Sequence, residues 1–321
     1  MHPKVSIIIP VYNTSQYLER CLKSVLDQDL EEIEIFVIDD ASTDNSIKIL
    51  ESFVKRDERI ILKKFETNQG QAAARNWGIK QAKSDYILFV DSDDFLQPNV
   101  LRELYNKAYL ENLDILEARH YRLKVEKKEE FPPKFKLMSQ ILTGDKYLKE
   151  TNNISVMVWN KLWKRSFLIE NDILFKKRNF EDEDFVVRAF MQAKRVKNIG
   201  NFLYNYLIRQ NSTMRSEVTL GKVKDYVALT QELDRLYSKA DTVEMKQAIQ
   251  KLLNHNFLGG PEYFRNKDNK QVKSSFSTFK IIFSKYRWNI LTCKRTNIGL
   301  RILIFLDPFL ANLIYRKWRL K

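Results

Sequence analysis

The amino-acid sequence predicts an α/β fold in which a mostly parallel sheet is sandwiched by helices and followed by a helical C-terminal region. Short apolar segments alternate with amphipathic ones over the first ~120 residues, which is the pattern of strand–helix–strand units. After about residue 215 the strand signals fade, and helical periodicity continues with one break at Gly259-Gly260-Pro261. We therefore expect an α/β domain over residues 1–215 and a helical region over residues 216–321.

The predicted strands of the first region are short apolar runs. They lie at residues 5–10, 33–38, 59–65 and 86–90, where β-branched and aromatic residues suit buried strands. Helices are expected between them at residues 15–26, around Ile47, Leu50 and Val54, and at residues 71–83. The segments Asn13-Thr14-Ser15 and Ser42-Thr43-Asp44 supply side chains that can cap two of these helices. This alternation predicts parallel strands whose carboxyl ends meet at one edge of the sheet.

An acidic run, Asp91-Ser92-Asp93-Asp94, follows the fourth predicted strand, and Asp39 and Asp40 end the second strand in the same way. Ligands of open α/β sheets bind at the carboxyl ends of the strands, so these acids are candidate ligand-binding residues. Three carboxylates within four residues repel one another unless a cation neutralises them, and such oxygens suit Mg²⁺ or Mn²⁺ held jointly with substrate phosphates. The alternative is a solvated turn before a helix that begins near Pro98.

The composition indicates a globular chain that is acidic at the front and basic at the back. Hydrophobic residues make up 44% of the 321 residues, and there are only 8 Gly and 7 Pro. Residues 1–120 hold 15 of the 55 Lys and Arg and 21 of the 41 Asp and Glu, which leaves 40 basic against 20 acidic residues over 121–321 and a net charge of +14 for the chain. A basic region of this kind could bind nucleic acid, an anionic membrane or a phosphorylated acceptor.

Several classes of protein are not expected from the motif content. The two cysteines, Cys21 and Cys293, form no metal-binding pair, and Cys21 lies on an apolar helical face, which favours a core thiol in a reducing cytoplasm. Residues 4–12 are apolar but lack the basic leader and cleavage site of a signal peptide. Dinucleotide-binding and phosphate-loop glycine motifs are absent, as are zinc spacings and RNA-binding aromatic motifs, so nucleic acid is not an expected partner.

Four motifs together resemble the successive signatures of family-2 glycosyltransferases with the GT-A fold. They are VSIIIPVYN at residues 5–13, DDASTD at 39–44, NQG at 68–70 with ARN at 74–76, and DSDD at 91–94. The resemblance covers residues 4–210 and is to the type of enzyme that builds bacterial surface polysaccharides. It implies a GT-A-like fold and an inverting transferase that uses a nucleotide-activated sugar, most often a UDP-sugar.

The resemblance also implies roles for the residues of these motifs. Pro10 and Tyr12 would line the base pocket, and Asp40 would bond the uracil edge, a role that suits an acceptor-only carboxylate facing an N–H group. Asp39 and Arg75 would lie near the nucleotide, Asp91 would approach the ribose or the donor sugar, and Ser92 would belong to the same nucleotide-sugar-binding set. Asp93 would hold Mn²⁺ or Mg²⁺ on the diphosphate, and Asp94 is a candidate substrate contact. Taken alone, each residue has a helix cap, core packing or a surface ion pair as its alternative.

The acidic segment at residues 179–184 precedes an amphipathic helix and is a second candidate site. Inverting transfer needs one carboxylate to take the proton of the acceptor hydroxyl. In the family this base is the Asp of a Glu-Asp pair, which maps to Asp182, with Asp184 as the fallback. A helix N-terminus favours the ionised form that a base needs. Successive helical residues point ~100° apart, so the four acids cannot all face one site. The alternative is a helix start that merely carries negative charge.

Two further segments resemble family patterns near the donor and the acceptor. In Trp159-Asn160-Lys161-Leu162-Trp163, Trp159 and Lys161 are candidate substrate contacts, because aromatic faces suit the C–H surfaces of sugars; core packing is the alternative. Downstream, Tyr206, Arg209 and Ser212 fit the pattern Tyr-x-x-Arg-x-x-Ser. Arg209 is therefore a candidate contact of the diphosphate or the acceptor.

Residues 298–315 are strongly apolar but are interrupted by Arg301, Asp307 and Pro308 and flanked by basic residues. They predict a segment lying in the interface of an anionic membrane, or a helical hairpin that docks on the domain or on a second subunit to form a homo-oligomer. The expected location is the cytoplasm, with the protein peripheral on the inner face of the cytoplasmic membrane.

The sequence as a whole favours transfer of one hexose or N-acetylhexosamine from a UDP-sugar to a hydroxyl of a cell-surface glycan or lipid-linked acceptor. A processive polysaccharide synthase is one alternative, although its transmembrane helices and Gln-x-x-Arg-Trp motif are absent from the sequence. A basic protein that binds nucleic acid or another anionic polymer without catalysis is the other.

Overall fold

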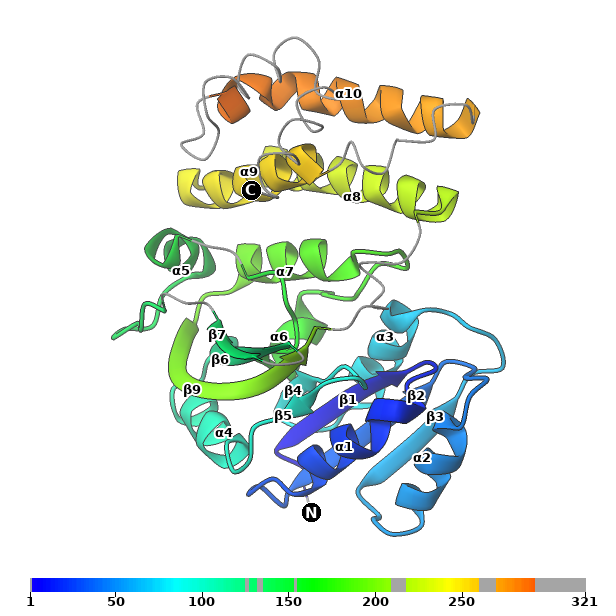
Figure 1. The fold of residues 1–321 in the computed structure, drawn as a ribbon. Coiled ribbons are helices and arrows are strands. Elements are labelled where there is room, and N and C mark those ends of the chain that lie inside the picture. Colours follow the sequence, from blue (N-terminus) through cyan, green and yellow to red (C-terminus); the bar gives the residue numbers. More distant parts are fainter. Residues whose placement is uncertain are drawn as a thin grey trace. The chain divides into compact units, whose positions relative to one another are not determined.

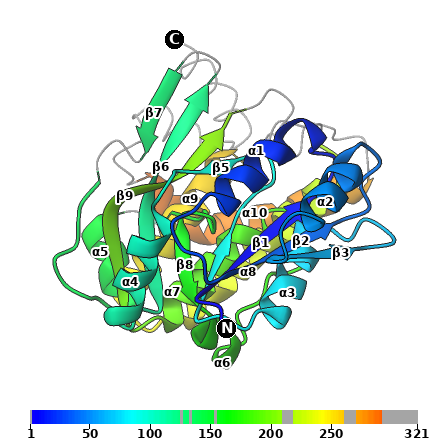
Figure 2. The same cartoon turned by 90° about the horizontal axis from the view of Figure 1, so that it is seen from below.

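The computed structural model describes residues 2–124, 127–131, 135–152, 155–208, 218–259 and 270–291. The chain divides into two compact units, Met1–Thr151 with Ser155–Arg215, and Asn152–Ile154 with Ser216–Lys321. The first unit contains a nine-stranded sheet with helices on both faces (Figures 1 and 2). The predicted α/β class is therefore confirmed.

The first four strands are parallel and lie in the order β3-β2-β1-β4. They are β1 (Val5–Val11), β2 (Ile33–Asp39), β3 (Ile60–Lys64) and β4 (Tyr86–Phe89). Val5 pairs with Ile33 of β2 on one side and with Tyr86 of β4 on the other. The apolar runs of the sequence form the expected strands, and this register brings the residues after β1, β2 and β4 to the same edge.

Three helices connect these strands: α1 (Ser15–Leu26), α2 (Ser46–Val54) and α3 (Gln71–Gln81). Helices α1 and α2 cover one face of the sheet and α3 covers the other (Figure 2), as right-handed crossovers require when the strand order turns back after β3. Gly78 permits a close approach of α3 to β1, because a Cβ atom there would lie 2.6 Å from Cγ2 of Ile8. The start of α3, with Arg75, is therefore held near the carboxyl edge of the strands.

The second half of the sheet is mixed, which the alternation in the first 90 residues does not predict. It contains β5 (Phe95–Leu96), β6 (Ile115–Lys124), β7 (Lys127–Phe131), β8 (Lys161–Lys164) and β9 (Val196–Leu207). Strand β8 is antiparallel to β4 and β6, whereas β9 is parallel to β6. Strand β9 curves strongly (Figure 1), and its register with β6 shifts near Arg119. The helices of this half are α4 (Leu101–Leu110), α5 (Gly144–Thr151), α6 (Arg165–Glu170) and α7 (Glu181–Gln192).

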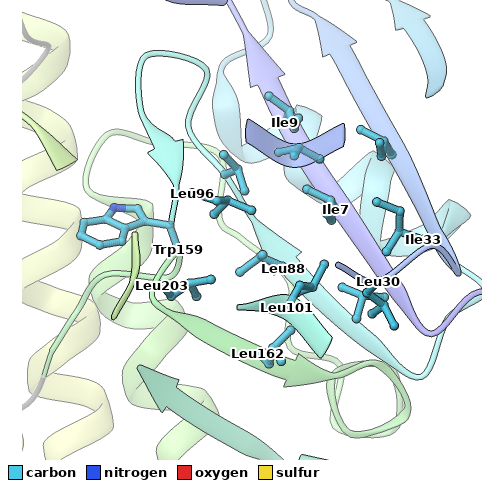
Figure 3. Close-up of a cluster of buried hydrophobic side chains, with 14 of the residues drawn as sticks. Ile7, Ile9, Leu30, Ile33, Leu88, Leu96, Leu101, Trp159, Leu162 and Leu203 are labelled. Atoms are coloured by element: carbon cyan, nitrogen blue, oxygen red, sulfur yellow. The ribbon is translucent and has the colours of Figure 1, made fainter. Parts of the chain in front are cut away.

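A large hydrophobic cluster of the first unit lies between the sheet and the helices on one of its faces (Figure 3). All seven residues of β1 are buried and all but Ser6 are apolar, so this strand does not alternate between apolar and polar residues, as expected for a central parallel strand. Ile7, Leu88 and Leu162 come from neighbouring strands and belong to the same cluster. Burying each such side chain contributes roughly 1.5–3 kcal/mol, which fixes the position of the carboxyl edge that carries the polar residues.

The second unit contains three helices in its described part, α8 (Leu220–Lys239), α9 (Val243–Gly259) and α10 (Lys270–Leu291). Aromatic side chains pack between them: the ring centroid of Phe257 lies 5.4 Å from that of Phe279 and 5.3 Å from that of Phe283. Over the described residues, the helices are too short or too polar to cross a membrane. Residues 298–315, expected to bind a membrane or another subunit, lie outside the described residues.

Candidate active site

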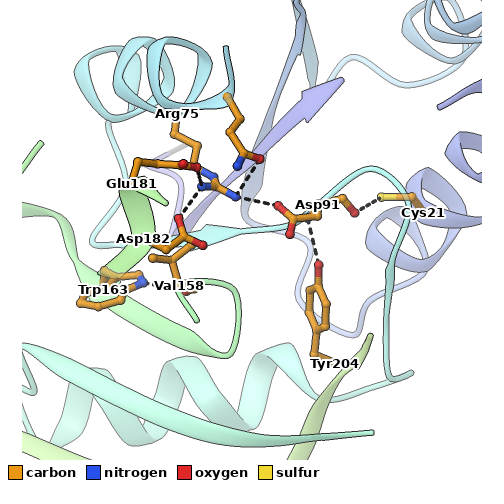
Figure 4. A network of polar contacts seen from close by, with 9 residues as sticks. Cys21, Arg75, Asp91, Val158, Trp163, Glu181, Asp182 and Tyr204 are labelled. Atoms are coloured by element: carbon orange, nitrogen blue, oxygen red, sulfur yellow. Dashed lines mark hydrogen bonds and ion pairs between the residues drawn. The ribbon is translucent and has the colours of Figure 1, made fainter. Parts of the chain in front are cut away.

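Residues from separate segments meet near the carboxyl edge of the parallel strands (Figure 4). Asp91 lies just beyond β4, Arg75 lies in α3, and Glu181 and Asp182 begin α7. Arg75 and Asp182 are hydrogen-bonded although they are 107 residues apart in the sequence. The structure therefore brings the acidic run and the acidic segment at 179–184 together.

The guanidinium of Arg75 binds three carboxylates at once. Nη2 donates to Oδ1 of Asp91 at 2.8 Å, and Nη1 donates to Oε1 of Glu181 at 2.8 Å and to Oδ1 of Asp182 at 2.6 Å. The side chains of Arg75 and Glu181 are buried, whereas that of Asp182 is 26% exposed. Charge-assisted bonds of this kind are short and directional, so Arg75 fixes the position of Asp182 through one oxygen and leaves the other oxygen accessible.

One guanidinium cannot neutralise three carboxylates, and the proton affinity of the acids rises accordingly. Burial raises the pKa of Asp182 to about 8, because the opposing charge of Arg75 is offset by Glu181 and Asp91. Burial also raises the pKa of Glu181. The direction of this shift is opposite to the expectation that the helix N-terminus favours the ionised form of Asp182. The helix dipole contributes only about 0.3–1 kcal/mol, which burial and like charges outweigh.

Asp184, the fallback base, does not join this group. Its side chain is fully buried and binds Arg178, and its Oδ2 accepts a hydrogen bond from Nε of Arg188 at 3.0 Å. Two residues along a helix turn the side chain by ~200°, so Asp184 points away from the side that carries Asp182. Asp184 thus stabilises the start of α7 through its ion pairs with Arg178 and Arg188. Asp182, and not Asp184, is the residue that binds Arg75.

The two acids at the end of β2 differ from what the sequence predicts. Asp40 accepts hydrogen bonds from the backbone N–H groups of Gln69 at 2.6 Å and Gly70 at 2.8 Å, so both of its oxygens hold the loop before α3. Gly70 has a φ of +84°, a conformation that glycine adopts without strain. Asp39 is also buried, and its Oδ1 has no hydrogen-bond partner among the described residues. Asp39, rather than Asp40, therefore offers an acceptor to a ligand.

Two members of the acidic run face inward. Ser92 is buried and accepts a hydrogen bond from the hydroxyl of Thr14 at 2.9 Å. Asp94 is 1% exposed, and its Oδ1 accepts a hydrogen bond from the backbone N–H of Leu207 at 2.7 Å. Burial, together with the charges of Asp93 and Asp91, raises the pKa of Asp94 well above its ordinary value. Asp94 therefore joins the acidic run to β9 through Oδ1, while its Oδ2 has no hydrogen-bond partner among the described residues. Its substrate contact stays a prediction.

Asp93 is partly exposed and is the member of the run best suited to a metal ion. In the part of the chain that the structure describes, no three acid, histidine or cysteine side chains lie close enough to hold a metal by themselves. This donor set fits a Mg²⁺ or Mn²⁺ ion of the kind that one or two carboxylates share with substrate phosphates. It does not fit a site made entirely of protein ligands.

Trp159 and Lys161 are both buried. Trp159 is 4% exposed and stacks on Tyr204, with ring centroids 4.2 Å apart. Nζ of the buried Lys161 donates to the backbone oxygens of Ser155 at 3.0 Å and Met157 at 2.8 Å. These contacts agree with the core alternative, and Lys161 fixes the segment that leads to Trp159. Substrate contact by either residue stays a prediction.

Of the remaining predicted site residues, some lie at the edge of the site and the others fall outside the described residues. Pro10 is buried at the end of β1, and Tyr12, which follows it, is 48% exposed and available to stack on a flat ligand. Tyr206 stacks at an angle of 11° on Trp159. Arg209 and Ser212 lie outside the described residues.

Sequence reasoning missed two residues of the site. Glu181 shares Nη1 of Arg75 with Asp182, and the hydroxyl of Tyr204 accepts a hydrogen bond from the backbone N–H of Asp91 at 2.9 Å. The Glu-Asp pair itself could have indicated Glu181. The alternation of Phe202, Tyr204 and Tyr206 along β9 could have placed Tyr204 on one face of a strand.

Comparison with protein families finds one model, glycosyl transferase family 2, that matches residues 6–170 of the chain. The chain is 35% identical over 233 residues to the uncharacterized glycosyltransferase EpsJ of Bacillus subtilis, a match that covers 70% of this chain and 66% of that protein. It is 28% identical over 307 residues to the glycosyltransferase GlyG of Streptococcus pneumoniae, which covers 90% of this chain and 99% of that protein.

Solved structures show similarity of fold. S. aureus TarS 1-349 in complex with UDP-GlcNAc superposes with a TM-score of 0.71 at 21% identity, over 98% of this chain and 92% of that chain. The mannosyltransferase PcManGT from Pyrobaculum calidifontis, in complex with GDP-Man and Mn²⁺, superposes with a TM-score of 0.53 at 14% identity, over 98% and 88% of the two chains. These matches confirm the GT-A-like fold expected from the sequence.

Proposed function

Because the chain belongs to glycosyltransferase family 2, we propose that it moves one sugar from a UDP-sugar to a hydroxyl group of a cell-surface glycan or lipid-linked acceptor. The observation that carries the proposal is the joint contact of Arg75 with Asp91 and Asp182. It sets a residue of the expected donor site beside the expected base. The UDP-GlcNAc complex of the similarly folded TarS supports a UDP-linked hexose or N-acetylhexosamine as the donor.

The nucleotide end of the proposed site lies at β1 and β2. The unpartnered Oδ1 of Asp39 would accept the uracil N–H, which would satisfy a buried acceptor that the described residues leave without a hydrogen bond. Pro10 and the exposed ring of Tyr12 would flank the base. Asp40 would act indirectly by holding Gln69 and Gly70 in place.

We assign the diphosphate end to Asp93, with Asp91 nearer the ribose or the donor sugar. Asp93 would hold Mn²⁺ or Mg²⁺ together with the diphosphate, and the Mn²⁺ complex of PcManGT supports this assignment. When bound, such an ion neutralises the charge that develops on the leaving UDP. Asp91 cannot move freely, because its Oδ1 is held by Arg75 and its backbone N–H by Tyr204.

Asp182 is the proposed base. Arg75 holds its Oδ1, and its other oxygen is free of hydrogen bonds within the described residues, so this oxygen can accept the proton of an acceptor hydroxyl. A pKa near 8 places its titration close to neutral pH, where a proton acceptor is most effective. Attack by the activated hydroxyl on the face opposite the leaving diphosphate would invert the configuration of the sugar.

The basic C-terminal region is proposed to choose the acceptor or the location of the enzyme. Residues 298–315 keep their two predicted uses, on an anionic membrane surface or against a second subunit. Co-sedimentation of the full chain with anionic liposomes, compared with its oligomeric state in solution, separates these two uses.

The function is tested by incubating the protein with a series of UDP-sugars and Mn²⁺ and measuring UDP release, with and without acceptor extracts. We expect one UDP-sugar to be hydrolysed slowly by wild type. Asp182→Asn should reduce turnover by at least ~10²-fold while the Kd for UDP stays within a factor of two or so, since only the base is lost. Glu183→Gln, a change in the same turn of α7, is the matched control and should retain turnover. If the wild-type protein does not bind UDP, the proposed donor is refuted.

A further inference from the structure

Arg122 of β6 carries a positive charge that no acid in the described part of the chain neutralises by direct contact. Within the residues that the structure describes, its guanidinium forms neither a hydrogen bond nor an ion pair; it lies 3.4 Å from the centroid of the Phe131 ring. Its Nε is buried and unpartnered. Glu129 faces Arg122 in the strand register but pairs with Lys124 at 3.3 Å. Arg119, on the opposite face of β6, binds Glu130 at 2.7 Å.

His120, two residues before Arg122, is also unsatisfied. Its side chain is 1% exposed, and neither ring nitrogen has a hydrogen-bond partner among the described residues. The ring lies 4.7 Å from Trp159 and 5.0 Å from Phe131, so Phe131 contacts both His120 and Arg122. Buried polar groups are normally paired, and leaving one unpaired costs roughly 1–3 kcal/mol. An unpaired buried histidine beside a partly exposed arginine whose buried Nε is also unpaired therefore points to a missing ligand.

The side chains of His120 and Arg122 lie on the face of β6 that is shared with Tyr204 and Tyr206 of β9. His120 pairs in register with Tyr204 and Arg122 with Tyr206, and alternate residues of a strand share a face. Tyr204 binds the backbone N–H of Asp91. Burial and the charges of Asp94, Asp93 and Asp91 raise the pKa of Tyr206, whereas the charge of Arg122 lowers it. Tyr206 is therefore close enough to interact electrostatically with the acidic run and with Arg122.

We propose that Arg122 and His120 form a subsite for a phosphate group of a substrate, adjacent to the sugar-transfer site. The guanidinium provides a planar pair of N–H donors that matches phosphate oxygens, and one ring nitrogen of His120 provides a further donor. The phosphate belongs either to the donor diphosphate or to an anionic acceptor. The assignment of this phosphate to a substrate of sugar transfer rests on the proposed function, whereas the binding of phosphate at Arg122 does not.

The subsite is tested on the intact protein with inorganic phosphate as the probe. The chain has three histidines, so histidine-selective NMR labelling gives few signals, and His120→Asn identifies the one of interest. Phosphate should shift the His120 signal in wild type and in Arg119→Gln, the matched control. Arg122→Gln should weaken phosphate binding at least ~10-fold, as expected for loss of a charged hydrogen bond. Sodium chloride at equal ionic strength should produce no shift.

The Kd for UDP, measured on the same variants, distinguishes the two sources of phosphate. A Kd that rises at least ~10-fold in Arg122→Gln, with phosphate competing against UDP, assigns the subsite to the donor diphosphate. An unchanged Kd, with phosphate and UDP bound together, assigns it to an anionic acceptor. Phosphate binding that is equal in wild type and Arg122→Gln, or that is lost equally in Arg119→Gln, overturns the proposal. If wild type binds phosphate but not UDP, the proposed donor fails while the subsite stands.

Discussion

Replacement of Glu181 by glutamine should move the pH dependence of sugar transfer to lower pH. Glu181 and Asp182 both bind Nη1 of Arg75, at 2.8 and 2.6 Å, so their two oxygens lie at most about 5.4 Å apart. An ionised Glu181 within this distance raises the energy of an ionised Asp182 by at least ~3 kcal/mol at an effective dielectric constant of 20. Partial protonation of Glu181 reduces this value, because burial raises its own pKa.

The expected shift follows from the proton balance. Asp182 must be ionised to act as a base, so kcat/KM of wild type should rise with pH and level off above its pKa of about 8. Glutamine has the shape of Glu181 without its charge. The midpoint in Glu181→Gln should therefore fall by about 1–2 pH units, since one unit corresponds to 1.36 kcal/mol.

The assay is UDP release over pH 5.5–9.5 at low donor concentration, with Glu19→Gln as the control. Glu19 lies on the exposed side of α1 and pairs with Lys23, so its loss changes the net charge equally without touching Arg75. A midpoint that stays in place, or that rises, in Glu181→Gln would refute the electrostatic account of the site. A matching shift in Glu19→Gln would show that net charge alone is responsible.

Three other outcomes follow from the structure. Asp93→Asn and chelation by EDTA should each lower turnover by several orders of magnitude if the ion neutralises the leaving UDP, and full activity in EDTA would exclude that role. Asp39→Asn should raise the Kd for UDP by ~10-fold or more, whereas Asp40→Asn should mainly lower the thermal midpoint of unfolding by releasing Gln69 and Gly70. Calorimetry measures both quantities, and the reverse pattern would assign the uracil contact to Asp40. Gly78→Val should destabilise the fold by about 1–3 kcal/mol in urea unfolding, because its Cβ would lie 2.6 Å from Ile8.

The parallel half of the fold could be predicted from the sequence because its strands are continuous apolar runs. The same rule does not reach β6 and β9, whose outer parts contain charged and polar residues such as Arg122 and Asn205. Their pairing depends on contacts between residues about 85 positions apart, which local periodicity does not encode.

The sequence predicts which residues form the candidate site better than it predicts the contacts that each of them makes. The family motifs indicated Arg75, Asp91 and Asp182, and all three meet. The surroundings of Asp39 and Asp40 could not be predicted, because adjacent residues of a strand end point in opposite directions and the sequence does not show which one meets the loop before α3. For Trp159 and Lys161 the sequence left core packing and substrate contact as alternatives, because composition does not distinguish a buried position from a lining position.

The shared guanidinium of Arg75 has a thermodynamic consequence for ligand binding. Asp91 contributes to the raised proton affinity of Asp182, and both acids bind the same arginine. Any ligand that draws charge away from Asp91 must therefore change the number of protons bound at Asp182. By reciprocity, pH must change the affinity for that ligand by the same factor. Donor binding should then be accompanied by release of a fraction of a proton, detectable as a heat of binding that depends on the ionisation enthalpy of the buffer.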